Sequence, residues 1–532
     1  MVSRIVIALI AVIYTGCSPE LPVKSLIFNS LNAGRKESNS AVTAKDYSNS
    51  VAITEREHLA ILKTQDKHVI TEDELYEIVN SAVSITAKNN SVFRVTGKNR
   101  TEVMTYEQEP VELFEYTFAN HETASRRFVL ASSDLRVGTI LAVGEGSLKN
   151  TSEEFVEFLF DGLENYINAA ILKYNSITEE EILSALDKLE RRQPYAAHNA
   201  AAAVNNRGEW VLDKSDSDFL IQKQPMLMTQ WGQGTVGPNK PNGYVYNNYI
   251  KDFYKNDQFL AGCGPVAVAQ IISYHGYISQ TAQHKPPNFS CDDWGNWNGR
   301  YDLELMSAVP KWRNRDSAVV NINLNPRTQI PIPLLPSMDV VKGQLNALMF
   351  QTGKLTKARY REGYTEINMT NARAAFVQLG YNIYYYNGAT RLTGTPENFK
   401  AYYGTSPDVI RNALDGDMPI MMRGGSDVIS EYGKKSGHFW VVDGYGGMTY
   451  LYQYFRQTAE KQIVYTTLAL NNGLMVHCNM GWDGNSDGWY IYGIFDTTYD
   501  LFNPSSPFNP VFNRADEWNF SNRTHVLIPA KP

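Results

Sequence analysis

The sequence predicts an α+β protein, with a compact α+β unit in the N-terminal half and a strand-rich region after it. Three observations support this fold class. The chain has 532 residues, of which 43% are hydrophobic and 20% charged, a composition typical of globular proteins with two to four domains. Apolar stripes at helical spacing follow N-terminal capping boxes before residue 200. Strand-like runs dominate after residue 380.

The N-terminus has the features of an export signal. Arg4 precedes a short apolar run at 5–14, which is too short to span a bilayer as a helix of roughly 20 residues would. Small residues then precede Cys17, as in a bacterial lipoprotein signal. We expect 1–17 to be that signal and Cys17 to be lipidated, with ordinary signal-peptide cleavage nearby as the alternative. The mature chain would then be held by lipid at the outer membrane or cell surface of a Gram-negative bacterium, or released after processing.

Composition shifts divide the rest of the chain. A polar stretch rich in Ser, Asn and Lys predicts a tether, and a small, polar stretch at 195–207 predicts an exposed linker. The expected domains are a tether at 18–60, a compact α+β domain at 61–215 and a second domain at 216–532. Within the compact domain we expect helices that begin at the capping residues Thr71, Thr151 and Thr178, and strands at 113–118, 127–131 and 139–143.

Charge and cysteine usage exclude several functions. The net charge is -7 and no long basic run occurs, so the sequence offers no electrostatic footprint for nucleic acid. The four cysteines show neither CxxC spacing nor a zinc-like pairing with histidine. We therefore expect no metal and no cofactor.

Cys263 is the first candidate for chemistry. Gly262 and Gly264 flank it, and Pro265 opens an apolar run that predicts a buried helix. At a helix N-terminus the unpaired N–H groups and the positive end of the dipole favour a thiolate. A structural cysteine at the start of a buried helix is the alternative.

His438 is the first candidate for the base that would accept the thiol proton. It begins a predicted strand after a glycine-bearing loop, where an imidazole can face a cleft, although a lone histidine is more often structural. Further on, the side-chain oxygen of Asn479 could accept from the imidazole N–H and orient the ring. His477, on the same strand face as Asn479, is a rival base. Upstream, the amide of Gln233 could donate to an oxyanion together with the Cys263 N–H, or it could simply face solvent.

Four motifs taken together resemble the streptopain family of papain-like cysteine peptidases. The first is Trp231-Gly-Gln233, and the second runs from Ala261 through Cys263 to Gln270 with Tyr274-His275 after it. The third is Gly437-His438-Phe-Trp-Val-Val-Asp-Gly-Tyr445. The fourth is His477-Cys-Asn479-Met-Gly-Trp482-Asp-Gly484 followed by Ser486-Asp-Gly488. They occur in the family's order over about 230–490.

The resemblance implies a papain-like cysteine protease fold with a separate α+β pro-domain. Residues 128–136 resemble strands of the family's propeptide, so the resemblance implies a zymogen whose pro-domain blocks the cleft and is cut off between about 193 and 225. Proteins or peptides would be the substrates, and the chain's own pro-domain would be an intramolecular inhibitor. The resemblance implies that Cys263 is the nucleophile and His438 the base. It implies that Asn479 orients the base and that Gln233 donates to the oxyanion. Gly437 and Trp482 would line the substrate cleft.

The sequence departs from the family pattern in three places. Gly264 and Pro265 replace the usual residues after the cysteine, and Met480 stands where the family has Trp. An insertion of about 20 residues near 448–470 separates the histidine motif from the asparagine motif. Two other functions stay open: another Cys-His-Asn hydrolase, such as a peptidoglycan amidase or a transglutaminase-like enzyme, and a non-catalytic binding lipoprotein on a protease scaffold.

Overall fold

The structure is a computed structural model, and it describes nineteen stretches of the chain. These are residues 50–65, 68–86, 92–105, 107–122, 125–150, 153–190, 195–197, 209–227, 229–234, 251–252, 257–279, 348–361, 364–379, 381–387, 407–424, 437–457, 463–482, 484–495 and 525–530. Cys17 and the expected export signal lie outside them.

The N-terminal part of the structure contains the helices and strands that the sequence predicts there. At two of the predicted helix starts, Thr71 and Thr178, the capping boxes form, because each Thr side chain accepts from the backbone N–H three residues later and the Glu there accepts in return. The elements are β1 (Ser50–Ile53), α2 (Glu55–Leu62), α3 (Glu72–Thr86), β2 (Arg94–Met104), β3 (Pro110–Ala119), β4 (Arg126–Ser132), β5 (Ile140–Glu145), η1 (Leu148–Asn150), α4 (Glu153–Asn175) and α5 (Glu179–Glu190).

The C-terminal part combines long strands with fewer helices. The predicted helix at Cys263 and the predicted strand at His438 are both confirmed, and residues 348–355 are also helical. The other elements are β6 (Tyr195–Ala197), β7 (Val211–Lys223), β8 (Lys251–Asp252), β9 (Asp257–Gln258), α6 (Cys263–Ser279), β10 (Arg359–Arg361), β11 (Tyr364–Glu366), α9 (Met369–Gln378), β12 (Asn382–Asn387), α10 (Pro407–Asp415), β13 (Ile420–Gly424), β14 (His438–Gln457), β15 (Ile463–Asn479), β16 (Gly488–Ile491), η4 (Tyr492–Ile494) and β17 (His525–Ala530).

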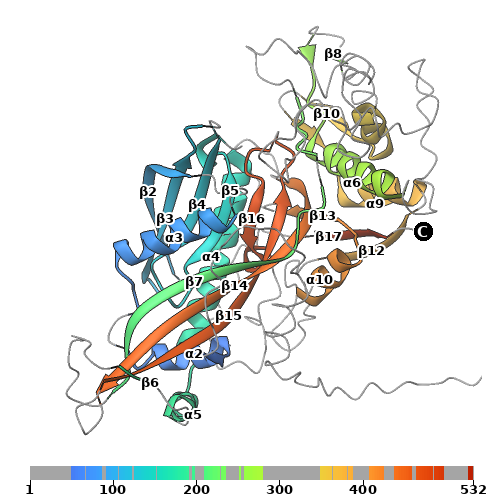
Figure 1. Ribbon diagram of the computed structural model, residues 1–532. Helices are drawn as coiled ribbons and strands as arrows, with labels where there is room; N and C mark the ends of the chain where they lie inside the picture. The colour runs from blue at the N-terminus through green and yellow to red at the C-terminus, as the bar shows by residue number, and fades with distance from the viewer. Residues whose placement is uncertain are drawn as a thin grey trace, which may run out of the picture.

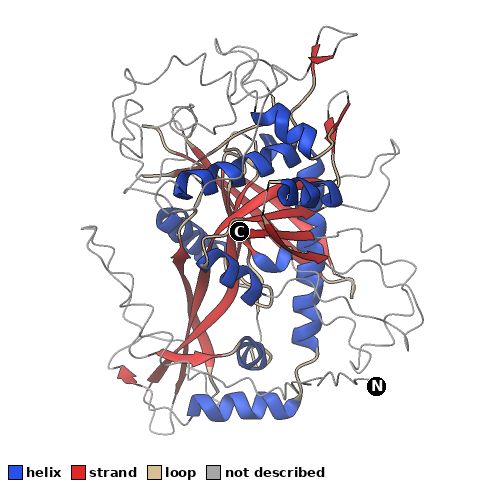
Figure 2. Cartoon of the chain, turned by 90° about the vertical axis from the view of Figure 1, so that its right-hand side faces the viewer, coloured by secondary structure: helices blue, strands red, loops and turns tan. Residues whose placement is uncertain are grey.

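One large sheet connects the two parts of the molecule (Figure 1). Among the described strands its main path runs β12-β17-β13-β14-β15-β16-β5-β4-β3-β2, while β1 and β6 pair with β15 and β7 pairs with β14. Helices lie around the twisted strands in the view of Figure 2. The mixture of helices with a mostly antiparallel sheet confirms the α+β class.

The N-terminal part of the structure joins the C-terminal sheet directly. β16 pairs with β5 in antiparallel register, with Gly488 opposite Gly144 and Tyr490 opposite Ala142. Because this junction is an ordinary ladder, the four strands β2–β5 continue the C-terminal sheet. The sequence could not reveal the junction, since the paired residues lie more than 300 positions apart.

The insertion near 448–470 forms the outer half of the long β14–β15 hairpin. We call residues 448–457 and 463–471 the arm. The two strands of the arm pair with each other, from Met448 with Asn472 to Gln457 with Ile463. β7 covers one edge of the arm and β1 the other. The arm points away from α6 toward the N-terminal helices, so the insertion is a structural element of the sheet (Figure 1).

Described elements lie at three of the expected boundaries, and the division into domains stays a prediction. The expected tether at 18–60 includes β1 and most of α2, because alternating Val51 and Ile53 pack inward and the capping box of Thr54 and Glu57 starts the helix. The expected linker at 195–207 begins as β6, and 198–207 lies outside the described residues. The boundary at 215/216 falls inside β7, and eleven of the thirteen β7 residues pair with β14.

Candidate active site

Cys263 is the first residue of α6, as the sequence predicts. Gly262 before it has a φ of +92°, in the left-handed region that glycine favours, and a Cβ there would meet the Thr365 side chain at 2.7 Å. The chain can therefore turn sharply into the helix only with glycine at this position. Cys263 is half-buried, and its backbone lies at the positive end of the helix dipole.

His438 is the first residue of β14 and is buried, with 6% of its surface exposed. Its Nε2 lies 2.9 Å from the backbone oxygen of Met480. Because a carbonyl oxygen can only accept, Nε2 carries the proton and donates it. In the neutral ring Nδ1 is then the basic nitrogen, so the hydrogen bond selects the tautomer that can accept a proton at Nδ1.

Burial also determines the charge of this imidazole. It lowers the pKa of His438 to about 3, while the hydrogen bond to Met480 acts in the opposite direction. The ring is therefore a neutral base at pH 7. It becomes a stable cation only when an anion such as a thiolate lies beside it.

The start of α6 packs against the start of β14 and the loop after β15. A Cβ on Gly264 would meet Phe439 at 3.5 Å, and Phe439 directly follows His438. A Cβ on Gly481 would meet Val266 at 3.3 Å. Val266 lies three residues after Cys263, on the same face of the helix. The structure therefore brings the neighbours of Cys263 against the neighbours of His438.

The Trp482 ring covers one face of the His438 imidazole. It stacks on His438 with centroids 4.1 Å apart and planes 20° apart, and Trp440 lies parallel at 6.2 Å. Trp482 is half-buried. The indole shields the His438 ring from water, so the aromatic cover persists although Met480 replaces the family's other tryptophan.

Asn479 directs its hydrogen bonds to groups other than the His438 ring, and its expected orienting role stays a prediction. Its side-chain oxygen accepts from Gln270 Nε2 at 3.0 Å and from the backbone N–H of Gly481 at 3.2 Å. Its amide nitrogen donates to the backbone oxygen of Thr229 at 2.6 Å. Asn479 therefore joins three segments: the one that leads to Gln233, the helix of Cys263 and the loop of Trp482. The backbone oxygen of Met480 accepts from the His438 ring.

Asp487 accepts a hydrogen bond from the Met480 backbone, and we did not predict this role from the sequence. Its side-chain oxygen accepts from the Met480 N–H at 2.7 Å, and the residue is 0% exposed. The Met480 carbonyl thus lies between two backbone N–H groups that are held by hydrogen bonds. The Met480 N–H donates to Asp487, and the Gly481 N–H donates to Asn479. Asp487 belongs to the Ser-Asp-Gly motif, which is the only sequence signal that points to it.

Gln233 lies next to the cysteine segment. Its backbone oxygen accepts from the N–H of Ala261 at 2.7 Å, two residues before Cys263, and its side chain is half-buried. Trp231 anchors the same segment in the core. Gly437 lies against Arg423, because a Cβ at 437 would meet the guanidinium at 2.7 Å.

The other histidines of this region belong to different networks. His477 Nδ1 lies 2.6 Å from Asp443 Oδ1, and the other oxygen of Asp443 accepts from the Leu227 N–H. His275 Nδ1 lies 3.2 Å from the Tyr381 hydroxyl. His477, the rival base, therefore has the buried carboxylate of Asp443 as its partner, and this contact links β15 to β14.

No group of three or more His, Cys, Asp or Glu in the described stretches could hold a metal ion. No helix in these stretches is long and apolar enough to cross a membrane.

Comparison with known proteins gives the class of this site. Residues 241–490 match the model of a cysteine peptidase family, and the match includes Cys263, His438 and the loop of Asn479 and Trp482. This match is consistent with a cysteine-type peptidase. The matched family is peptidase C10, the streptopain family. No curated protein matches the chain significantly.

Proposed function

We propose that the protein is a cysteine endopeptidase, made as a zymogen, that hydrolyses peptide bonds with Cys263 as nucleophile and His438 as base. The observation that carries this proposal is the hydrogen bond from His438 Nε2 to the Met480 carbonyl. It directs a basic Nδ1 away from the loop, and α6 presents the helix start that bears Cys263 to the same region.

In the proposed reaction, Nδ1 takes the proton of the Cys263 thiol and the thiolate attacks the substrate carbonyl. The negative charge that develops on the oxygen is stabilised by the backbone N–H of Cys263 at the helix start and by the side-chain amide of Gln233. The imidazolium then protonates the leaving amine, and the neutral ring later activates the water that hydrolyses the thioester. Trp482 keeps bulk water from the ring. Gly437, at the start of the strand, lines the substrate cleft in this proposal.

Cleavage of casein and of the precursor itself tests this reaction. Wild-type protein should cut both, while Cys263→Ala and a thiol alkylator should each abolish cutting. His438→Ala should be far less active than His477→Ala, because His477 is paired with Asp443 in another network. Cleavage of casein by the Cys263→Ala protein would exclude this thiol as nucleophile. Hydrolysis of peptidoglycan without hydrolysis of casein would indicate an amidase instead.

We further propose that the precursor is exported and lipidated at Cys17, and that activation cuts the chain before β7. The residues of β7 are protected by their ladder with β14, which makes the chain N-terminal to them the better substrate. Cys17→Ser should move the protein from the membrane fraction to the soluble fraction. Retention of that variant in membranes would exclude lipid as the anchor.

A further inference from the structure

We propose that residues 50–190 stay bound to the catalytic region after activation, so that the mature enzyme is a two-chain complex. This inference rests on the proposed cleavage of the zymogen before β7. It departs from the expected pro-domain, which would be removed once cut. Four kinds of contact carry it.

The first contact is the sheet itself. β5 pairs with β16 over Gly144–Gly488, Val143–Trp489 and Ala142–Tyr490, and β1 pairs in parallel with β15 over four residues. The two strands enter the catalytic sheet at different places. Their release would leave unpaired backbone groups along β15 and β16, which are otherwise central strands.

The second contact is the core on one face of the sheet, which the arm shares with the N-terminal helices. Tyr452 stacks on His58 of α2 with ring centroids 4.1 Å apart. The hydroxyl of Tyr450 accepts from the Ile140 N–H. From residues 50–190 this core includes Leu59, Ile61, Leu75, Val79, Phe118 and Val129. From the C-terminal part it includes Tyr450, Tyr452, Tyr454, Leu468, Leu470 and Trp489.

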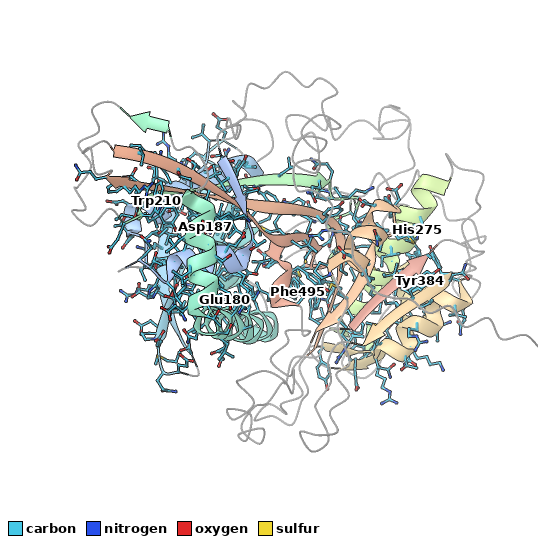
Figure 3. All side chains as sticks on the ribbon, turned by 90° about the horizontal axis from the view of Figure 1, so that it is seen from below. Glu180, Asp187, Trp210, His275, Tyr384 and Phe495 are labelled. Atoms are coloured by element: carbon cyan, nitrogen blue, oxygen red, sulfur yellow. The ribbon has the colours of Figure 1, made fainter. Side chains whose placement is uncertain are left out.

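The third contact is the core on the opposite face. Here α4 packs against η4, and a Cβ on Gly162 would meet Ile494 at 2.7 Å. This core combines Leu159, Leu163 and Ile167 of α4 with Trp440, Tyr490 and Phe495 of the catalytic region. Figure 3 shows Phe495 between the N-terminal residues Glu180 and Asp187 and the catalytic-region residues His275 and Tyr384.

The fourth contact joins Glu145 to segments that carry the candidate active-site residues. The backbone of Glu145 donates to the oxygen of Asp487 at 2.7 Å and accepts from the N–H of Ser486 at 2.8 Å. Its carboxylate accepts from Gln230 Nε2 at 2.9 Å. Glu145 thus touches both the loop that carries Trp482 and the segment that carries Gln233.

Together these contacts make separation unfavourable. Loss of residues 50–190 would expose the arm and both faces of β14–β16 at once, whereas soluble proteins rarely expose apolar patches larger than a few hundred Å². The covered surface is apolar, continuous and paired by backbone hydrogen bonds, as in an obligate interface. Cutting one peptide bond outside it removes none of these contacts.

The test uses the full chain with Cys263→Ala and a recognition sequence for a specific protease inserted between β6 and β7. The external protease cuts this chain whether or not the protein is itself a peptidase, so failure here is separate from failure of the proposed function. After the cut, size-exclusion chromatography and native mass spectrometry should find both fragments in one species with the mass of the uncut chain. They should separate only in denaturant. Elution of a soluble C-terminal fragment without its N-terminal partner would overturn the proposal.

A matched pair of variants addresses the arm. Tyr452→Ala removes a buried ring that stacks on His58, whereas Tyr384→Ala removes an exposed ring in β12. In the cut protein, Tyr452→Ala should lower the urea concentration at which the N-terminal fragment is released, and Tyr384→Ala should not. Equal release in both variants would contradict a role for the arm.

Discussion

At the scale of single residues, the Met480 carbonyl oxygen determines which nitrogen of His438 is basic. A backbone acceptor cannot be lost by substitution, and its position depends on the amides on either side of it. Asn479 and Asp487 hold these amides, so both act on His438 through the backbone. We regard them as positioning residues.

Substitution of Asp487 tests this arrangement. Asp487→Ala leaves the buried Met480 N–H without its acceptor, which costs about 1–3 kcal/mol and lets the carbonyl shift. We expect kcat to fall by about tenfold or more with KM little changed, as measured by steady-state peptide hydrolysis. Asp487→Asn keeps an acceptor oxygen and should restore most of the rate. Equal losses in the two variants would mean that the carboxylate charge matters instead.

The sequence predicted where the reactive side chains begin their elements, but it did not predict what orients the base. Gly262, Cys263 and Pro265 give a local signal for a helix start, and Gly437 with His438 gives one for a strand start. The identity of a residue does not predict whether a distant side chain will hydrogen-bond to its backbone carbonyl. The Met480 carbonyl accepts from His438, whereas the hydrogen bonds of Asn479 go to segments far away in the chain, which no local pattern predicts.

At the scale of elements, the β5–β16 junction depends on a close approach of two backbones. A Cβ on Gly488 would collide with the backbone oxygen of Val143 and meet the Cα of Gly144 at 2.5 Å. A Cβ on Gly144 would collide with the Phe128 ring. Larger residues at these positions would force β5 and β16 apart.

Two alanine substitutions test the junction. Gly488→Ala should lower the free energy of unfolding by about 1–3 kcal/mol or more, because the added methyl has no room. Gly447→Ala is the matched control on β14, since a Cβ there meets nothing within 4 Å, and its effect should stay within about 1 kcal/mol. Urea unfolding measures both. A Gly488→Ala protein as stable as the control would mean that the junction is not tightly packed.

Local patterns predicted the elements better than their partners. The capping boxes at Thr71 and Thr178 have a fixed spacing, and both are confirmed. The four residues of β1 carry little strand signal by themselves, because their pairing partner is the distant β15. The sequence showed the arm only as an insertion, because the arm packs into a core formed with residues about 400 positions earlier in the chain.

At the scale of the whole molecule, buried histidines make the joined structure sensitive to acid. His58 lies in the core between α2 and the arm, stacked on Tyr452, and burial lowers its pKa to about 4. Its pKa in the unfolded chain is about 6.5. Between these values the unfolded state binds more protons, so the stability decreases as the pH falls through this window.

Replacement of His58 tests this coupling. His58→Phe keeps an aromatic ring against Tyr452 but cannot titrate. Unfolding free energies measured at pH 7 and pH 4 should differ less in this variant than in wild type, by up to about 3 kcal/mol. The same substitution at the exposed His121 is the control and should leave the wild-type difference in place. An unchanged difference in His58→Phe would show that this histidine does not couple folding to pH.

The most direct measurement of the central claim is the pH dependence of Cys263 alkylation, with and without His438. We expect the wild-type thiol to react with iodoacetamide well below pH 7, because Nδ1 of His438 takes its proton. In His438→Ala the reactivity should move toward the ordinary thiol pKa of about 8.5. Overlapping profiles for the two proteins would contradict the assignment of His438 as the base of Cys263.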